Sequence, residues 1–244
     1  MTDYWTCPPD REVDGWGDFT ITVLHPPFPT TAGPSTLAMI AGLAPHDPVR
    51  AREFAEAFGT VEAVLEELPR TDTVSVFPAT RSDLDVIRVG VWGNVIGISD
   101  PALADNGTNC PLLEEVEALH KLYPDARIVG SAHNDMGADH SEDAILLPGG
   151  LMLHSEGWDS SRWDLTGDPH AILAALGTTA ESLVGTDAEL AAGSPADTNW
   201  QAFGSLALGP LDPWHFDVVQ MSAFRVRHTE YYTGLMEEVW HLED

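Results

Sequence analysis

The sequence has few basic residues for its length. Its 244 residues include 11 Lys and Arg against 39 Asp and Glu, which gives a formal net charge of −28 at pH 7. A surface this negative repels nucleic-acid phosphates and anionic lipids. We therefore expect no direct nucleic-acid binding and no membrane binding. The charge favours a basic protein partner or a cation, and the alternative is an ordinary solvated acidic surface.

Cysteine is also scarce. The two cysteines, Cys7 and Cys110, belong to no Cys-x-x-Cys pair, and the first residues, MTDYWTCPPDREVDG, lack the basic and apolar regions of a secretory signal. Isolated cysteines without a signal are typical of reduced thiols in a cytoplasmic protein, with a single disulfide as the alternative. No run of about 18 apolar residues is present, so we expect no transmembrane helix.

Motifs that identify a catalytic site are absent as well. The sequence contains no GxxxxGK[ST] loop, no HExxH, no GxSxG and no Cys/His spacing of a zinc ribbon. The pair Gly15-x-Gly17 lacks the third glycine of a dinucleotide-binding turn and follows no predicted strand. Function must therefore be sought in clusters of side chains that the fold brings together.

Several segments have the residue pattern of β-strands. In residues 18–25 apolar residues alternate with threonines, and prolines follow. Residues 83–101 predict two central strands joined by a tight turn at Trp92-Gly93-Asn94. Further strands are predicted at residues 126–132, 143–148, 151–157 and 218–228, with a hairpin turn at Pro148-Gly149-Gly150.

Residues 47–68 predict one kinked helix or two consecutive helices. Asp47 and Pro48 suit a first turn, and apolar residues follow at spacings of three and four up to Leu68. Gly59-Thr60 interrupts this stripe, so the kink or the second start is expected there. Other helices are predicted at residues 111–122, 168–177 and 200–208, and a further helix near the C-terminus. A short helix is predicted at 37–43 and a loop at 178–198.

The order of these elements predicts the fold class. Strands and helices do not alternate strictly, which disfavours a parallel sheet. We expect an α+β fold of one domain, with a mostly antiparallel mixed sheet and helices packed on one face. Residues 1–17 are expected to be an irregular N-terminal arm, and residues 18–244 the single domain.

Five segments of the sequence resemble a known family. They are DREVDG, the predicted helix AFGTVEAVLEELP, DLDVIRVGVWGNVIGISDPALADNG, the tripeptide Gly-Asp-Pro at residues 167–169, and FRVRHTE. Over most of the chain, they resemble a family of uncharacterised actinobacterial proteins, mostly from Streptomyces. The resemblance implies a bacterial cytosolic protein and brings no assigned activity, so no functional residue follows from it.

The densest cluster of metal-binding side chains lies after the strand predicted at 126–132. His133, Asp135, Asp139 and His140 fall in a segment expected to be a loop, and loops often present functional residues. Imidazole and carboxylate groups are good ligands for Zn²⁺, Mn²⁺ or Fe²⁺. An open coordination position on such an ion acidifies a bound water for hydrolysis.

His154 and Glu156 extend this cluster. They are two residues apart on a predicted strand, so both side chains project from the same face. If that face meets the loop, a His/His/Asp-type metal site forms with Glu156 as its catalytic base. The predicted ligands are His133, Asp135, Asp139, His140 and His154. The alternative is a hydrated surface loop, with His154 hydrogen-bonded in or beside the core.

The string HNDMGADH superficially resembles the HxHxDH motif of metallo-β-lactamase-type hydrolases. It lacks the middle histidine, and its Asp-His pair falls too late. That identity is therefore rejected, and any metal chemistry must be argued from the side chains themselves.

Three arginines lie inside predicted strands of this acidic chain. Arg225 and Arg227 share one face of the last strand, and Arg88 lies mid-strand. Because arginine binds carboxylate and phosphate through two parallel hydrogen bonds, the three are candidate anion-binding residues. The alternative is that they pair with some of the 39 acids. Four tryptophans in or beside predicted loops line either a pocket or the core: Trp158, Trp163, Trp200 and Trp214.

Two functions are compatible with these patterns. The first is a non-enzymatic, acidic cytosolic interaction protein that binds a basic protein partner, as an inhibitor or immunity-like protein does. The alternative is a metal-dependent hydrolase, or another small-molecule enzyme, that uses the His/Asp cluster at 133–156. The cofactor is accordingly either none or one divalent metal, Zn, Mn or Fe, and the oligomeric state stays open.

Overall fold

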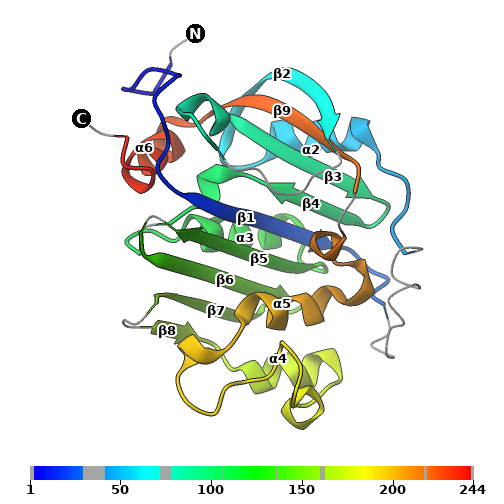
Figure 1. Ribbon diagram of the computed structural model, residues 1–244. Coiled ribbons are helices and arrows are strands. Elements are labelled where there is room, and N and C mark those ends of the chain that lie inside the picture. The colour runs from blue at the N-terminus through cyan, green and yellow to red at the C-terminus, as the bar shows by residue number, and fades with distance from the viewer. Residues whose placement is uncertain are drawn as a thin grey trace.

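The computed structural model describes residues 3–29, 42–71, 78–105, 107–135, 137–159, 163–216 and 219–242. These residues form one nine-stranded sheet in the order β2-β9-β3-β4-β1-β5-β6-β7-β8 (Figure 1). All neighbouring strands are antiparallel. The predicted α+β fold of a single domain with an antiparallel sheet is thus confirmed.

The strands of the sheet are β1 Trp16–Leu24, β2 Val61–Thr71, β3 Val86–Trp92, β4 Val95–Ser99, β5 Arg127–Asp135, β6 Asp139–Leu147, β7 Leu151–Trp158, β8 Trp163–Thr166 and β9 Met221–His228. The five α-helices of the described residues are α2 Pro48–Ala57, α3 Pro111–Leu122, α4 Pro169–Leu176, α5 Trp200–Leu208 and α6 Glu230–Val239. None of these helices has the length and apolar character needed to cross a membrane.

Helices cover both faces of the sheet, so the prediction that they pack on one face is wrong. Val129 and Gly130 are successive residues of β5 and point to opposite faces. A Cβ atom on Gly130 would lie 2.8 Å from the Leu112 side chain in α3. A Cβ atom on Gly204 in α5 would lie 2.9 Å from the Val129 side chain. We call these two sides the α3 face and the α5 face; in Figure 1 the α5 face is in front.

Each face has its own apolar core, which explains why both need helices. The α3 face carries the larger core, where residues of α2, α3 and α6 pack on the sheet. The α5 face carries a smaller core around Ile145, Leu147 and Leu153, against Phe203 of α5 and Ile172 of α4. Consecutive apolar residues in β6 therefore serve two cores, which is typical of a strand buried on both sides.

The helix predicted to reach Leu68 ends much earlier. Its start is confirmed, because the Asp47 side chain accepts hydrogen bonds from the first amides of α2. The helix stops at Ala57, and β2 follows from Val61 and pairs with β9 with three register shifts. Pairing with a neighbouring strand overrides the helical periodicity, since β propensity depends mainly on such contacts.

Most other elements agree with their predictions. The hairpin of β3 and β4, the helices α3, α5 and α6, and the strands β1, β7 and β9 are confirmed. The C′ position of α4 is Gly177 with φ +77°, as predicted for a left-handed helix end. Strand β8 was not predicted, and the short helix expected at 37–43 lies largely outside the described residues.

The segment between residues 133 and 140 is a β-hairpin, so the predicted loop is wrong. β5 continues to Asp135 and β6 begins at Asp139, and the two strands pair along their whole length. The predicted metal ligands therefore take the alternating directions of strand residues. The N-terminal arm is irregular before β1 and is docked by hydrogen bonds from Trp5 to Asp85 and from Thr6 to Glu237.

Candidate metal centre

A repeated tripeptide places four titratable side chains together on the sheet. His140-Ser141-Glu142 lies on β6 and His154-Ser155-Glu156 lies on β7. In each tripeptide the histidine and the glutamate point to the same face, and the serine points to the other. The antiparallel register sets Glu142 directly opposite Glu156. All four His and Glu side chains consequently gather on the α3 face.

The N-terminus of α3 completes this cluster. Cys110 is the N-cap residue of α3, and its thiol donates a hydrogen bond of 2.9 Å to Glu156 Oε2. Glu142 Oε1 accepts a hydrogen bond of 3.1 Å from the backbone amide of Leu113, in the first turn of the helix. A carboxylate is stabilised there because the first amides of a helix lack intrahelical partners. We call Cys110, His140, Glu142, His154 and Glu156 the metal centre.

Burial controls the protonation of these groups. Burial raises the pKa of the Glu142 carboxyl to about 7, against the opposing effect of its hydrogen bond with His154. Burial also lowers the pKa of the His140 imidazole to about 4, so this ring is neutral at pH 7. The thiol of Cys110 has a raised pKa, first because of burial and then because Glu156 accepts its hydrogen bond.

His154 and Glu142 form a buried pair. His154 Nε2 and Glu142 Oε1 are 3.0 Å apart, and Glu142 is fully buried. Burial acts most strongly and lowers the pKa of His154, but the hydrogen bond to Glu142 and the charges of Glu142, Glu156 and Asp143 together outweigh it, so the pKa is raised. Because Nε2 is engaged by Glu142, Nδ1 of the His154 ring is left for another partner.

Several buried polar atoms of the centre lack hydrogen-bond partners among the described residues. They are both ring nitrogens of His140, Oε2 of Glu142, and Oδ1 of the neighbouring Asn134. The His140 ring packs at 4.7 Å from Trp158, and its Nε2 lies 3.9 Å from Asp105 Oδ2. A buried polar group without a partner costs about 1–3 kcal/mol, so such atoms commonly mark the place of an ion or water.

Three of the side chains bring possible metal ligands close together. The Cys110 sulfur, a ring nitrogen of His154 and a carboxylate oxygen of Glu156 lie within 4.8 Å of one another. Thiolate, imidazole and carboxylate are the ligands that zinc takes in proteins, at distances of about 2.0–2.3 Å. Cys110 and Glu156 are only partly buried, so the site can be reached from solvent.

The structure divides the predicted metal ligands between several places. His140, His154 and Glu156 meet in the metal centre, whereas His133 lies on the α5 face, 3.3 Å from Asp143. Asp135 and Asp139 face each other at the end of the hairpin, where Asp135 accepts hydrogen bonds from Trp16 and Gly137. One site that contains all five predicted ligands is therefore excluded.

Sequence reasoning missed Cys110 and Glu142, which the structure adds to the centre. The repeated His-Ser-Glu tripeptide was the available signal, because a repeat on adjacent predicted strands brings like residues together. Nothing local indicated Cys110, which reaches the centre only because α3 packs against β5 and β6.

The candidate anion-binding arginines differ in their surroundings. Arg227 forms an ion pair of 2.6 Å with Glu62, and Arg225 lies 3.7 Å from Glu66, so both have acidic neighbours as the alternative interpretation held. Arg88 is half-buried, and its Nε has no hydrogen-bond partner in the described part of the chain. Burial lowers the pKa of the Arg88 guanidinium. The register places Arg88 on the same face of the sheet as Arg225, and a joint anion site stays a prediction.

The fold and the centre define a single-domain α+β protein with a Cys/His/Glu cluster beside a helix N-terminus. The chain belongs to a family of unknown function, DUF6333, whose model matches residues 4–243. The expected membership of an uncharacterised family is thus confirmed. No curated protein and no solved structure matches the chain.

Proposed function

We propose that this protein is a metal-dependent hydrolase in which Cys110, His154 and Glu156 bind a zinc-type ion. The observation that carries this proposal is the approach of three different metal-binding groups to within 4.8 Å of one another. Three protein ligands leave the fourth tetrahedral position open, as in catalytic zinc sites. A thiol among the ligands favours zinc over magnesium or calcium, with manganese and iron as weaker alternatives.

Glu142 would not touch the ion itself but holds the proposed ligand His154 in place by a hydrogen bond. Its Oε1 holds Nε2 of His154, which fixes the orientation of the ring and the tautomer with Nδ1 available. A carboxylate in this position is the usual partner of a metal-binding histidine and strengthens metal binding. The Leu113 amide holds the same oxygen, so the Glu142 side chain has little freedom.

Glu142 also has the position of a catalytic base. The Oε2 atom of Glu142 is buried without a hydrogen-bond partner among the described residues. The Cα atom of Glu142 pairs directly with that of the proposed ligand Glu156 across the two strands. A bound zinc-type ion supplies an acidified water. Glu142 Oε2 would accept the proton of that water during attack on a substrate carbonyl. We therefore assign the base to Glu142, and Glu156, for which the sequence suggested this role, to metal binding.

The charge of the protein narrows the substrate class. The centre contains two glutamates, and the whole chain carries a formal charge of −28. Phosphate esters and other anionic substrates are disfavoured by this field. We propose uncharged small molecules with an ester or amide bond as substrates.

The test is a hydrolysis assay with chelator-treated protein, before and after reloading with Zn²⁺. A panel of uncharged chromogenic esters and anilides serves as substrate. Loading should restore activity, and Glu142→Gln, kept zinc-loaded by excess Zn²⁺, should reduce it by about 100-fold or more. Glu114→Gln, on the exposed side of α3, is the matched control and should match wild type. Zinc-loaded wild type without activity above the metal-free protein would contradict the hydrolase proposal.

A second candidate is binding of a basic protein partner. Four of the few arginines already lie beside acids: Arg52, Arg81, Arg225 and Arg227. The remaining excess of acids is therefore available to attract a basic surface and to speed its encounter. Affinity capture from the host at low and high salt tests this function. A basic protein retained only at low salt supports it, and no enriched partner at either salt concentration contradicts it.

We also propose that the protein acts in the cytosol of an actinobacterium, as the sequence resemblance implies. Cys7 and Cys110 are both free in the structure, which suits a reducing compartment. Fractionation of host cells, with immunodetection in cytosol and culture medium, tests this location.

A further inference from the structure

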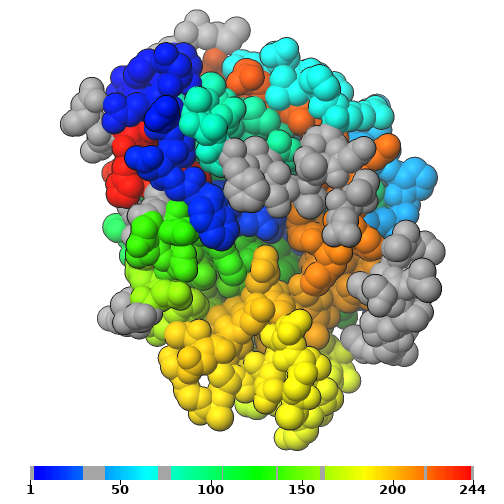
Figure 2. Space-filling view, in the orientation of Figure 1, coloured from blue at the N-terminus to red at the C-terminus, as the bar shows by residue number. Residues whose placement is uncertain are grey.

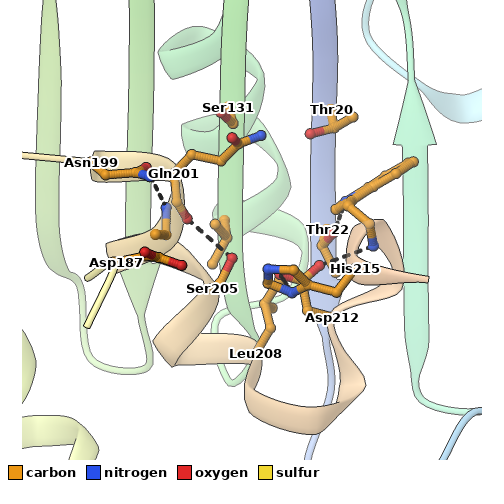
Figure 3. Close-up of a pocket in the computed structure, with 13 residues that line it drawn as sticks. Thr20, Thr22, Ser131, Asp187, Asn199, Gln201, Ser205, Leu208, Asp212 and His215 are labelled. Atoms are coloured by element: carbon orange, nitrogen blue, oxygen red, sulfur yellow. Dashed lines mark hydrogen bonds and ion pairs between the residues drawn. The ribbon is translucent and has the colours of Figure 1, made fainter. Parts of the chain in front are cut away.

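A second concave site lies on the α5 face, away from the metal centre. Its floor is formed by Thr20 and Thr22 of β1 and by Val129 and Ser131 of β5, and its walls by α5 and the turn that follows α5. The cavity has a volume of about 230 Å³. Figure 3 shows the labelled side chains of the strands and of the α5 side around this space.

The polar floor is a consequence of the β1 pattern. The alternating residues of β1 on the α3 face are apolar, and the β1 residues that line the cavity on the α5 face are Thr20 and Thr22. Neither threonine is more than slightly exposed. The indole nitrogen of Trp214 donates a hydrogen bond of 2.6 Å to Thr22 Oγ1, which fixes the aromatic ring at the cavity.

The buried carboxylate of Asp212 holds Trp214 and His215 in place in the turn that follows α5. Asp212 is 2% exposed, and its Oδ1 accepts the backbone amide of Trp214 at 3.1 Å. Its Oδ2 lies 3.1 Å from Nδ1 of the half-exposed His215. Both oxygens of Asp212 are therefore engaged within the protein. Because Nδ1 faces Asp212, the opposite ring nitrogen of His215, Nε2, is left for a ligand.

The lining groups select the chemistry of a ligand. No Lys or Arg among the described residues lines the cavity, so an anion has no counter-charge from them there. Asp212 already has His215 as its partner, so a cationic ligand is not needed to neutralise it. The groups that remain are the Thr20 hydroxyl, the carboxamides of Asn199 and Gln201, and the carboxylate of the exposed Asp187, which accepts hydrogen bonds from ligand hydroxyls. Together these groups donate and accept hydrogen bonds, which matches the hydroxyl groups of a neutral ligand.

The volume sets the size of the ligand. An apolar cavity of about 150 Å³ accommodates benzene. A cavity of about 230 Å³ therefore accommodates one six-membered ring with several hydroxyl substituents. Val129, Ala202 and Leu208 supply the apolar contacts that the carbon skeleton of such a ring needs.

We propose that the cavity between β1, β5 and α5 binds a neutral, polyhydroxylated ring of monosaccharide size. This inference goes beyond the proposed hydrolase, because the cavity and the metal centre lie on opposite faces of the sheet. Thr20, the carboxamides of Asn199 and Gln201, and Nε2 of His215 bind the ligand hydroxyls, and Trp214 and Val129 contact the ring. Binding requires no metal ion.

The test is saturation-transfer NMR, followed by titration calorimetry of each compound that gives a signal. The probes are D-glucose, D-galactose, D-mannose, D-ribose and myo-inositol, with putrescine and inorganic phosphate as charged comparisons. At least one polyol should bind, and with equal affinity to metal-free and zinc-loaded protein. Preferred binding of putrescine or phosphate would overturn the proposed ligand class. Absence of a saturation-transfer signal from all five polyols would overturn the proposal.

Two substitutions locate the binding. Ala202→Trp fills the cavity from α5 and should weaken binding at least tenfold, whereas Ala175→Trp on the exposed side of α4 is the matched control and should leave it unchanged. If Ala202→Trp does not fold, Gln201→Ala removes one carboxamide from the exposed rim and should weaken binding about threefold. Unchanged affinity in the folded variant would place the ligand elsewhere and overturn the proposal.

Discussion

Glu142 on β6 lies directly opposite Glu156 on β7, and both carboxylates point to the sheet face that α3 covers. Two carboxylates at neighbouring positions disfavour each other's charged form, the more so when burial removes water. Hydrogen bonds from His154, the Leu113 amide and the Cys110 thiol offset part of this cost. A divalent cation between Cys110, His154 and Glu156 would offset more of it, so the native state should be stabilised by zinc.

The first prediction follows from this coupling. A ligand that binds only the folded state adds about 2.7 kcal/mol when its free concentration is 100 times Kd. For a chain of 244 residues this corresponds to a rise in Tm of roughly 5–10 °C. Calorimetric scans with and without Zn²⁺ measure the shift. It should disappear in Cys110→Ser and persist in Cys7→Ser; an equal shift in both variants would mean that zinc binds elsewhere.

The second prediction concerns two helical glycines. Gly204 of α5 packs on the sheet, where an added Cβ would lie 2.9 Å from Val129, whereas a Cβ on Gly234 of α6 would have no neighbour within 4 Å. Gly204→Ala should lower the free energy of unfolding by about 1–3 kcal/mol through overpacking. Gly234→Ala should raise it by about 0.4–1 kcal/mol, because alanine restricts the unfolded chain.

Urea denaturation of both glycine variants measures these changes. Wild type is the reference, and the two substitutions should differ in sign. Equal stabilisation by both alanines would show that α5 does not lie as close to β5 as the structure has it, and the cavity on the α5 face would then have different walls.

The third prediction concerns His215. The hydrogen bond with Asp212 raises the pKa of His215 above its ordinary value of 6.5. The pair therefore stabilises the folded state fully below pH 6.5, and the contribution is lost as the pH rises through the raised pKa. An NMR titration of the His215 ring should give a pKa above 6.5 in wild type and a lower one in Asp212→Asn. A value at or below 6.5 in wild type would contradict the pairing.

The sequence predicted the sheet better than it predicted the site. Strand alternation in β1 and the turn at Gly93 are local signals, so they survive in the structure. The failure at β2 has a tertiary cause. The segment has helical spacing, but its backbone pairs with β9 from Val61 to Thr71, and a partner strand so distant in the sequence cannot be seen in the local pattern.

The candidate site depended on which face each residue takes. Treating residues 133–140 as a loop left His133 and His154 free to meet, whereas the hairpin register sends them to opposite faces. The pair His154 and Glu156 was correctly placed on one face because it needed only strand alternation. Cys110 could not be found in this way, since its position depends on how α3 packs on the sheet.

The central claim is that Cys110, His154 and Glu156 bind a zinc-type ion. Elemental mass spectrometry of tag-free protein tests it most directly, with wild type measured beside His154→Ala and beside His133→Ala as the control on the opposite face. The account predicts close to one zinc per chain in wild type and in His133→Ala, and a large loss in His154→Ala. Wild type without metal after exposure to zinc, or equal metal content in all three proteins, would contradict it.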